Sequence, residues 1–260
     1  MRYLKLIVAL GAIALLAGGA SAVTYTIEHP HSQGFYAGAG SVSFNRGNSW
    51  VDAWLGRFVM VPITPLPADY PTYPYSDHPK AFFSYCLELD QGIGVGHGVS
   101  YSFTIGPLAG TDGVSAGEAP LISELFGRYD PLLQNDPTGP YTGGTFRTAS
   151  AALQLAIWKI NLDAATETLG SWDFTSGLMR VDHNLLTQES GASAKADVVA
   201  LAMLNSLTGT CPMAWGLEGL HNATYQDLII QSIPEPVTMA GLMMGIGGLV
   251  TYVRKRRMAA

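Results

Sequence analysis

Cysteine is the residue with the most chemistry to offer in this chain, because it occurs only twice in 260 residues. Cys86 lies in the run SYCLELDQ, residues 84–91, whose alternation predicts a strand with Ser84, Cys86 and Glu88 on one face. A thiol in such a strand can serve as a nucleophile, or it can pair with the second cysteine, Cys211. The spacing alone leaves both uses open.

The simpler use is a disulfide between Cys86 and Cys211, because secreted chains that keep two cysteines usually pair them. This bond would close a loop of roughly 125 residues and stabilise the fold by roughly 4 to 5 kcal/mol. The chain would then be a non-reactive structural or carbohydrate-binding protein of the extracellular matrix.

The second unusual residue is Gln154, which lies in the middle of the apolar helical pattern AALQLAIWKI, residues 151–160. Trp158 follows one turn later on the same face. An amide among apolar side chains must find hydrogen-bond partners or lose free energy. On position alone, an internally bonded or exposed glutamine would explain it.

Taken together, the two motifs resemble the thioester domains of bacterial surface adhesins, which carry a "YC" strand motif and a "TQxAIW" helix motif. The matching residues here are Tyr85-Cys86-Leu87-Glu88 and Gln154-Leu155-Ala156-Ile157-Trp158, in a compatible strand-then-helix order.

The resemblance implies that the Cys86 thiolate attacks the side-chain carboxamide of Gln154 and releases ammonia, which leaves an internal thioester. Tyr85 and Trp158 would then shield the bond from water. An amine or hydroxyl on another cell, protein or polysaccharide would be acylated once, so the chain is expected to be a covalent binder and not an enzyme. No cofactor or metal is expected.

Two enzymatic alternatives have weaker support in the sequence. A Cys-His hydrolase would need a histidine near Cys86, and none of the available ones lies in a recognisable motif: His97, His183 and His221. A glycosidase could use Glu88 and Asp90 as paired carboxylates, but alternate residues of a strand more often form a solvated face.

The elements that must position these residues follow the order strands, helices, strands. Strand patterns are expected at residues 35–44, 49–63, 81–89 and 99–105, and again at 213–218 and 224–233. Helices are expected at 117–127, 146–164 and 192–207. This order predicts an α+β fold in which a helical subdomain is inserted into a β-sandwich or barrel, all within one domain of residues 23–233.

The first 22 residues predict a cleaved secretory signal peptide. Arg2 and Lys5 precede an apolar run, which closes on Ala20-Ser21-Ala22, the small residues that signal peptidase reads. The apolar run is too short to span a bilayer with ease.

Residues 234–260 resemble the PEP-CTERM sorting signal of Gram-negative bacteria. Pro234, Glu235 and Pro236 precede a short uncharged segment, residues 237–253, of nearly transmembrane length. A basic cluster follows and would hold this end in the cytoplasm: Arg254, Lys255, Arg256 and Arg257. The resemblance implies cleavage by an exosortase in the inner membrane and release to the cell surface or polymer matrix, so the only contact with membrane is through this tail.

Between the two ends, residues 23–233 hold 8 basic and 19 acidic residues, a net charge of −11. So negative a surface repels phosphate backbones, and nucleic acid is therefore not an expected partner.

Overall fold

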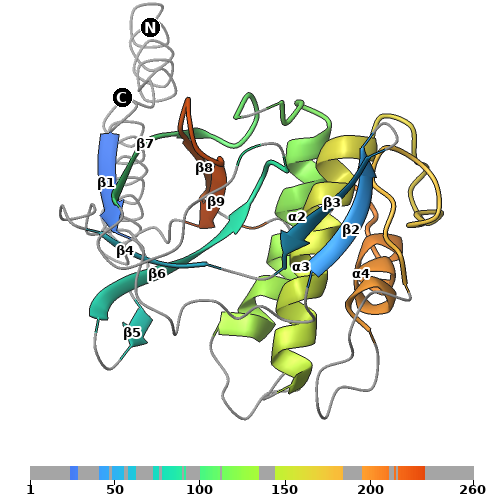
Figure 1. The fold of residues 1–260 in the computed structure, drawn as a ribbon, viewed down its shortest axis with the longest axis horizontal. Helices are drawn as coiled ribbons and strands as arrows, with labels where there is room; N and C mark the ends of the chain where they lie inside the picture. Colours follow the sequence, from blue (N-terminus) through green and yellow to red (C-terminus); the bar gives the residue numbers. More distant parts are fainter. Residues whose placement is uncertain are drawn as a thin grey trace, which may run out of the picture.

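The computed structural model describes the backbone of residues 24–28, 41–46, 49–55, 58–62, 73–75, 78–89, 91, 100–111, 113–134, 144–183, 195–210, 214 and 216–231. Within these residues the chain is a mixed α+β fold, with strands before and after three helices (Figure 1). The α+β class and the strand–helix–strand order predicted from the sequence are confirmed.

The larger sheet has seven strands and its order is β4-β1-β7-β8-β9-β6-β5. The strands are β1 (Thr24–Glu28), β4 (Phe58–Pro62), β5 (Tyr73–Tyr75), β6 (His78–Cys86), β7 (Ser100–Pro107), β8 (Leu217–His221) and β9 (Leu228–Gln231). These strands pair in antiparallel fashion, and β4 pairs with β6 as well as with β1. A hairpin of β2 (Ser41–Arg46) and β3 (Ser49–Trp54) forms a separate two-stranded sheet.

The single strand predicted for residues 49–63 is two strands with different partners. β3 pairs with β2, whereas β4 pairs with β1 and β6. The apolar character of both faces had suggested one strand covered on both sides. Periodicity reports burial and does not report which strand lies alongside, so it could not reveal this division.

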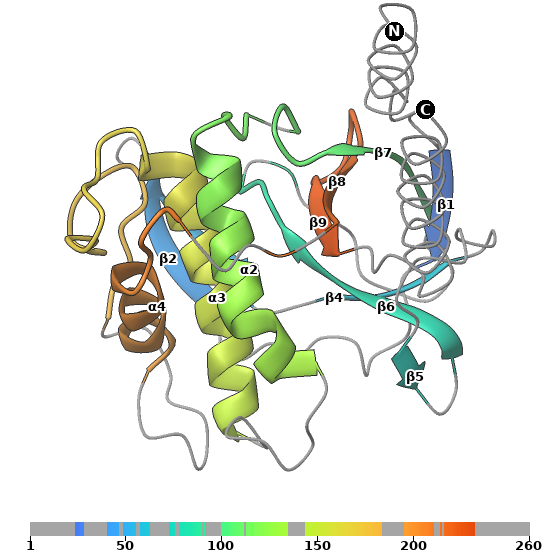
Figure 2. The same cartoon turned by 180° about the vertical axis from the view of Figure 1, so that it is seen from behind.

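Three helices lie between β7 and β8, and Figure 2 shows them together on one side of the molecule. They are α2 (Glu118–Gln134), α3 (Gly144–Asp163) and α4 (Ala196–Asn205). The expectation that α2 ends near Gly127 is wrong. A glycine inside a helix costs about 1 kcal/mol, and the burial of Ile122, Leu125 and Phe126 from the same helix outweighs that cost.

Helix α3 lies at the centre of the fold and contacts α2, α4 and β6. All its side chains from residue 148 to residue 160 are buried, so this stretch of the helix has no solvent face. Its interior polar residues include Gln154 and Lys159, neither of which has any exposed surface. These two side chains must find partners inside the protein, and the partners they find define the site described next.

Candidate functional site

Cys86 is the last residue of β6 and lies opposite Leu228 of β9. The next residue, Leu87, donates its N–H to the carbonyl of Asp227 at 2.8 Å, which continues the pairing with β9. Backbone groups of successive residues in an antiparallel strand point to opposite sides. The N–H and C=O of Cys86 therefore point away from β9, toward the other side of β6.

The side-chain amide of Gln154 binds both of these backbone groups. Cys86 donates its N–H to Gln154 Oε1 at 2.9 Å, and Gln154 Nε2 donates to the Cys86 carbonyl at 2.8 Å. The amide thus takes the place that a peptide group of a neighbouring strand would occupy. The structure brings together the two residues that the sequence paired, and both hydrogen bonds fix the orientation of the amide.

The thiol of Cys86 is free and only 2 % exposed. Burial raises the pKa of this thiol well above its usual range, and the negative charge of Glu88 raises it further. The sulfur is therefore protonated at neutral pH and needs a base before it can attack. Cys211, the predicted disulfide partner in the alternative interpretation, lies outside the described residues, so that pairing stays a prediction.

A second contact from α3 holds the same segment. Asn161 Nδ2 donates to the carbonyl of Leu87 at 3.0 Å. Asn161 follows Gln154 by seven residues, or nearly two helical turns, so both amides lie on one face of α3. Sequence reasoning missed Asn161, although a polar residue at this spacing in so apolar a helix was a usable signal.

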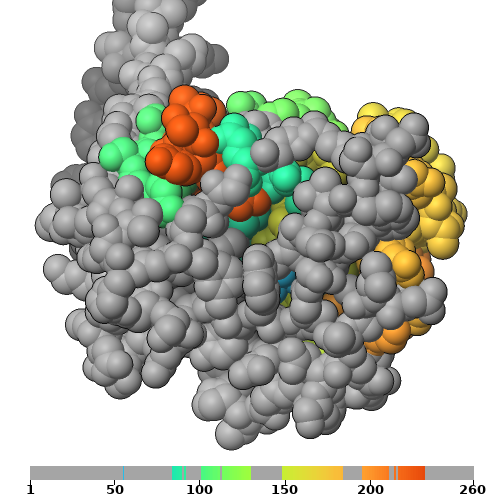
Figure 3. All heavy atoms as spheres, viewed as in Figure 1, coloured from blue at the N-terminus to red at the C-terminus, as the bar shows by residue number. Residues whose placement is uncertain are grey.

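The two predicted shielding residues are both buried, Tyr85 at 1 % exposure and Trp158 at 1 %. The Tyr85 ring packs edge-on against Phe126 of α2, with 5.5 Å between ring centroids. Figure 3 shows part of segment 84–91 (teal) at the surface beside residues 217–231 (red). Leu89 and Gln91 are half-buried, so the chain reaches solvent within a few residues of the thiol.

Glu88 is also buried and is tied to the loop before β9. Its Oε2 accepts the N–H of Asp227 at 3.2 Å, and its Oε1 accepts Gln91 Nε2 at 3.5 Å. The backbone carbonyl of Glu88 accepts a further hydrogen bond from Gln226 Nε2. Glu88 is therefore held within the interior and does not form the solvated face that the strand pattern favoured.

Two histidines of the described residues, His183 and His221, each pair with a carboxylate. His221 Nδ1 lies 2.7 Å from Asp227 Oδ2, and His183 Nδ1 lies 2.5 Å from Asp197 Oδ2. Both histidine side chains are 55 % exposed, unlike the buried Cys86. The remaining candidates for the hydrolase and glycosidase interpretations, His97 and Asp90, lie outside the described residues.

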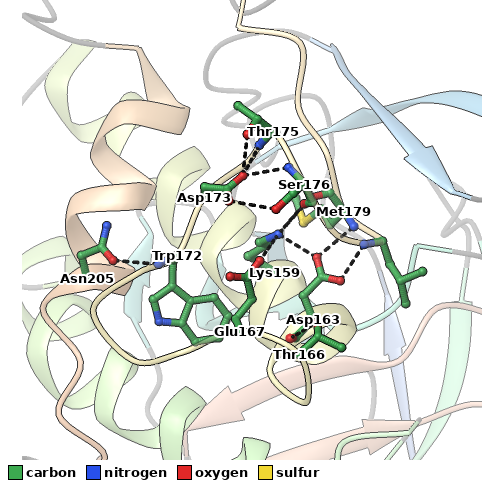
Figure 4. Close-up of polar contacts among 11 residues, drawn as sticks. Lys159, Asp163, Thr166, Glu167, Trp172, Asp173, Thr175, Ser176, Met179 and Asn205 are labelled. Carbon is green, nitrogen blue, oxygen red and sulfur yellow. Dashed lines mark hydrogen bonds and ion pairs between the residues drawn. The ribbon is translucent and has the colours of Figure 1, made fainter.

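Lys159 forms a buried cluster that fixes the segment after α3 (Figure 4). Its ammonium lies 2.8 Å from Asp163 Oδ2 and 3.0 Å from Glu167 Oε1. It also donates to the carbonyls of Ser176 and Met179. Asp163 in turn accepts the N–H groups of Leu178 and Met179. Buried charges need such partners, and here they tie residues 164–179 to the helix that carries Gln154.

Next to this cluster, Asp173 forms a turn with the residues that follow it. Hydrogen bonds from the Thr175 and Ser176 side chains and N–H groups lower the pKa of Asp173 to about 2.

Glu124 of α2 accepts hydrogen bonds from Thr208, Gly209 and Arg128. Burial opposes ionisation of Glu124, but these bonds outweigh it and lower its pKa. Both carboxylates therefore hold loops in place as anions.

The predicted sorting residues lie outside the described part of the chain, which stops at Gln231: Pro234, Glu235, Pro236, Arg254, Lys255, Arg256 and Arg257. The same holds for the predicted signal peptide. Among the residues that the structure does describe, no helix is long and apolar enough to cross a membrane. The same residues contain no group of three or more His, Cys, Asp or Glu side chains arranged to hold a metal ion.

Comparisons with protein-family models, curated proteins and solved structures find no match to this chain. The resemblance to thioester domains therefore rests on the two short sequence motifs alone.

Proposed function

We propose that this chain forms an internal thioester between Cys86 Sγ and the side-chain carbonyl carbon of Gln154, and that it uses this bond to bind a partner covalently. The observation that carries the proposal is the pair of hydrogen bonds between the Gln154 amide and the backbone of Cys86. They hold a carboxamide beside the one buried cysteine of the described chain.

The same two hydrogen bonds suit the reaction. When sulfur attacks the amide carbon, negative charge develops on Oε1, to which the Cys86 N–H already donates. The C–S bond forms, the C–N bond breaks, and Nε2 takes up the thiol proton and leaves as ammonia. A thiol does not usefully displace an amide in solution, but fixed geometry supplies effective molarities of roughly 10⁵ M or more.

The finished thioester is expected to persist because its surroundings are dry. Trp158 and Tyr85 are almost fully buried, and they place apolar area close to Gln154 and Cys86 in the chain. A nucleophile that reaches the bond, an amine or hydroxyl of a protein or polysaccharide, takes the acyl group, and the sulfur leaves and recovers a proton. Each molecule reacts once, so the function is capture and not turnover.

The proposal includes the setting in which capture would occur. The signal-like residues 1–22 and the PEP-CTERM-like residues 234–260 support export and processing by signal peptidase and exosortase, followed by display at the cell surface or in the polymer matrix.

We also infer a barrel-like closure of the larger sheet. The antiparallel pairings run β4–β1–β7–β8–β9–β6 and return to β4, which supports it.

The intact mass of the purified chain tests this proposal once its processed ends are assigned. A thioester lowers the mass by about 17 Da, the mass of ammonia, and treatment with methylamine then raises it to about 14 Da above the sequence value. Cys86→Ser is the matched control, which should show the sequence mass and no methylamine adduct.

A mass about 2 Da low that does not respond to methylamine would instead indicate a disulfide. That result would favour the non-reactive matrix protein with Cys86 paired to Cys211. A mass equal to the sequence value in the fresh wild-type chain would overturn the thioester outright.

A further inference from the structure

We propose that Lys159 Nζ and the Asp163 carboxyl group join in an amide bond with loss of water, and that Glu167 carries a proton in this reaction. The bond is a covalent modification near the end of α3 and does not depend on the proposed thioester. The observation that leads to it is a lysine side chain with no exposed surface in contact with two carboxylates.

The reacting groups already lie in contact (Figure 4). Lys159 and Asp163 stand four residues apart on α3, so their side chains meet on one helix face. Nζ lies 2.8 Å from Asp163 Oδ2, and the Asp163 side chain is only 1 % exposed. Glu167 Oε1 lies 3.0 Å from the same nitrogen. The nucleophile is therefore held against the carboxyl group that it would attack, in a site that excludes water.

Two backbone N–H groups bind the Asp163 carboxylate. Leu178 donates to Oδ1 at 2.6 Å, and Met179 donates to Oδ2 at 3.0 Å. When the nitrogen attacks Cγ, negative charge develops on Oδ1, to which the Leu178 N–H already donates. The segment after α3 thus supplies the donor that this attack requires.

The proton balance closes within these three side chains. One ammonium proton passes to Asp163 Oδ2, and the amine then attacks Cγ. A second proton moves from the nitrogen to the Glu167 carboxylate as the N–C bond forms. Glu167 gives this proton to Oδ2, the Cγ–Oδ2 bond breaks, and water leaves. Oδ1 becomes the amide oxygen, and Glu167 is again an anion.

Burial of the charges favours the amide over the ion pair. Attraction between two buried ions only partly offsets the free energy of removing them from water. The amide replaces the Lys159 cation and the Asp163 anion with one neutral group. Its remaining N–H can still bind Glu167 or one of the carbonyls that Lys159 contacts, those of Ser176 and Met179.

Tryptic peptides of Cys86→Ser test the inference, because this variant cannot form the thioester. Trypsin cuts after Arg147, Lys159 and Arg180 in the denatured chain and gives peptides 148–159 and 160–180. A lysine in an amide bond is not cut. We therefore expect one peptide, 148–180, about 18 Da lighter than its sequence mass. Lys159→Arg keeps the cation but cannot form the amide, so trypsin should cut after position 159 in that control.

Cell-free synthesis of the full chain, sampled over time by mass, measures how fast the bond forms. Glu167→Gln should form it at least about a hundredfold more slowly, the lower end of what general acid–base catalysis contributes. Glu118→Gln is the matched control and should react at the unaltered rate. It removes a carboxylate on α2, while glutamine can keep the contact with the Ser115 N–H that Glu118 makes.

The outcomes separate the amide from the thioester. Loss of water lowers wild type and Cys86→Ser alike by about 18 Da, so the intact masses expected for the thioester and its control then apply below this common shift. Full cleavage after Lys159 would overturn the amide, even with a lighter peptide 160–180, which would show that Asp163 had lost water to its own backbone. A wild-type mass lower by this shift alone and unchanged by methylamine would overturn the thioester and leave the amide.

Discussion

At the scale of single residues, the site depends on two side-chain amides that bind backbone groups of one short segment. Gln154 binds both polar backbone groups of Cys86, and Asn161 binds the carbonyl of Leu87. The first amide is the proposed reactant, whereas the second only holds the segment. The Gln154 and Asn161 side chains lie on one face of α3 and bind two successive residues, Cys86 and Leu87. Together they fix both the position and the direction of this backbone segment.

Asn161 is therefore expected to act as a positioning residue. Asn161→Ala should lower the rate of thioester formation by about tenfold, because small displacements of reacting groups have large kinetic effects. The mass time course measures this rate. Asn205→Ala is the control, since Asn205 of α4 likewise binds one backbone group, the N–H of Trp172.

Both variants should lose about 1 kcal/mol of unfolding free energy in urea. Only Asn161→Ala should slow the reaction. If the two variants react at the same rate, the contact with Leu87 has a structural role alone.

At the scale of elements, α3 is a buried axis held at its carboxyl-terminal end by the Lys159 cluster. The segment from residue 164 to 179 returns along the helix end, and its N–H groups bind Asp163 (Figure 4). This return is possible because Gly177 has a φ of 88° and comes very close to the Asp163 carboxylate. A Cβ at position 177 would lie 2.6 Å from Asp163 Oδ2.

Gly177→Ala should consequently destabilise the fold by about 2 to 4 kcal/mol, the sum of backbone strain and a steric clash. Gly170→Ala is a matched control, because Gly170 also has a positive φ, 80°, but an added Cβ there meets nothing within 4 Å. Its cost should be about 1 kcal/mol. Urea unfolding compares the two, and similar losses would mean that the close approach to Asp163 is unimportant.

The sequence predicted many of the helices and strands, and it missed specific side-chain contacts for physical reasons. The apolar pattern around Gln154 predicted α3 almost to its ends, and alternation placed Cys86 in a strand. Lys159 has one partner at helical spacing, Asp163. The sequence did not reveal the rest of the cluster, because Glu167, Ser176 and Met179 follow α3 in an irregular segment without periodicity. Glu88 was expected in solvent because alternation does not reveal that the loop before β9 covers it.

At the scale of the whole molecule, the proposed bond would join the sheet to the helical insertion. Cys86 and Gln154 are 68 residues apart in the chain. β6 belongs to the sheet and α3 to the helices between β7 and β8, so the bond would add a covalent crosslink to the hydrogen bonds that the described residues make between these two parts. Such a link reduces the conformational freedom of the unfolded chain.

Methylamine treatment should therefore lower stability as well as change mass. Opening a crosslink of this loop length should reduce the unfolding free energy by up to about 4 kcal/mol. Thermal melting before and after treatment measures the change. Cys86→Ser treated in the same way should melt unchanged, and an equal shift in that variant would show that methylamine acts elsewhere.

The hydrogen bond from Gln154 Nε2 to the Cys86 carbonyl can exist only before the thioester forms. The nitrogen that makes this bond is the atom that departs as ammonia, so the thioester has no donor at that position. Hydrolysis would place a carboxylate oxygen there, facing the carbonyl oxygen with like charge. Neither later state can recover the original pairing. Residue 154 would thus record the state of each molecule: glutamine before the bond forms, an acyl group in the thioester, glutamate after hydrolysis, and an amide or ester of the partner after capture.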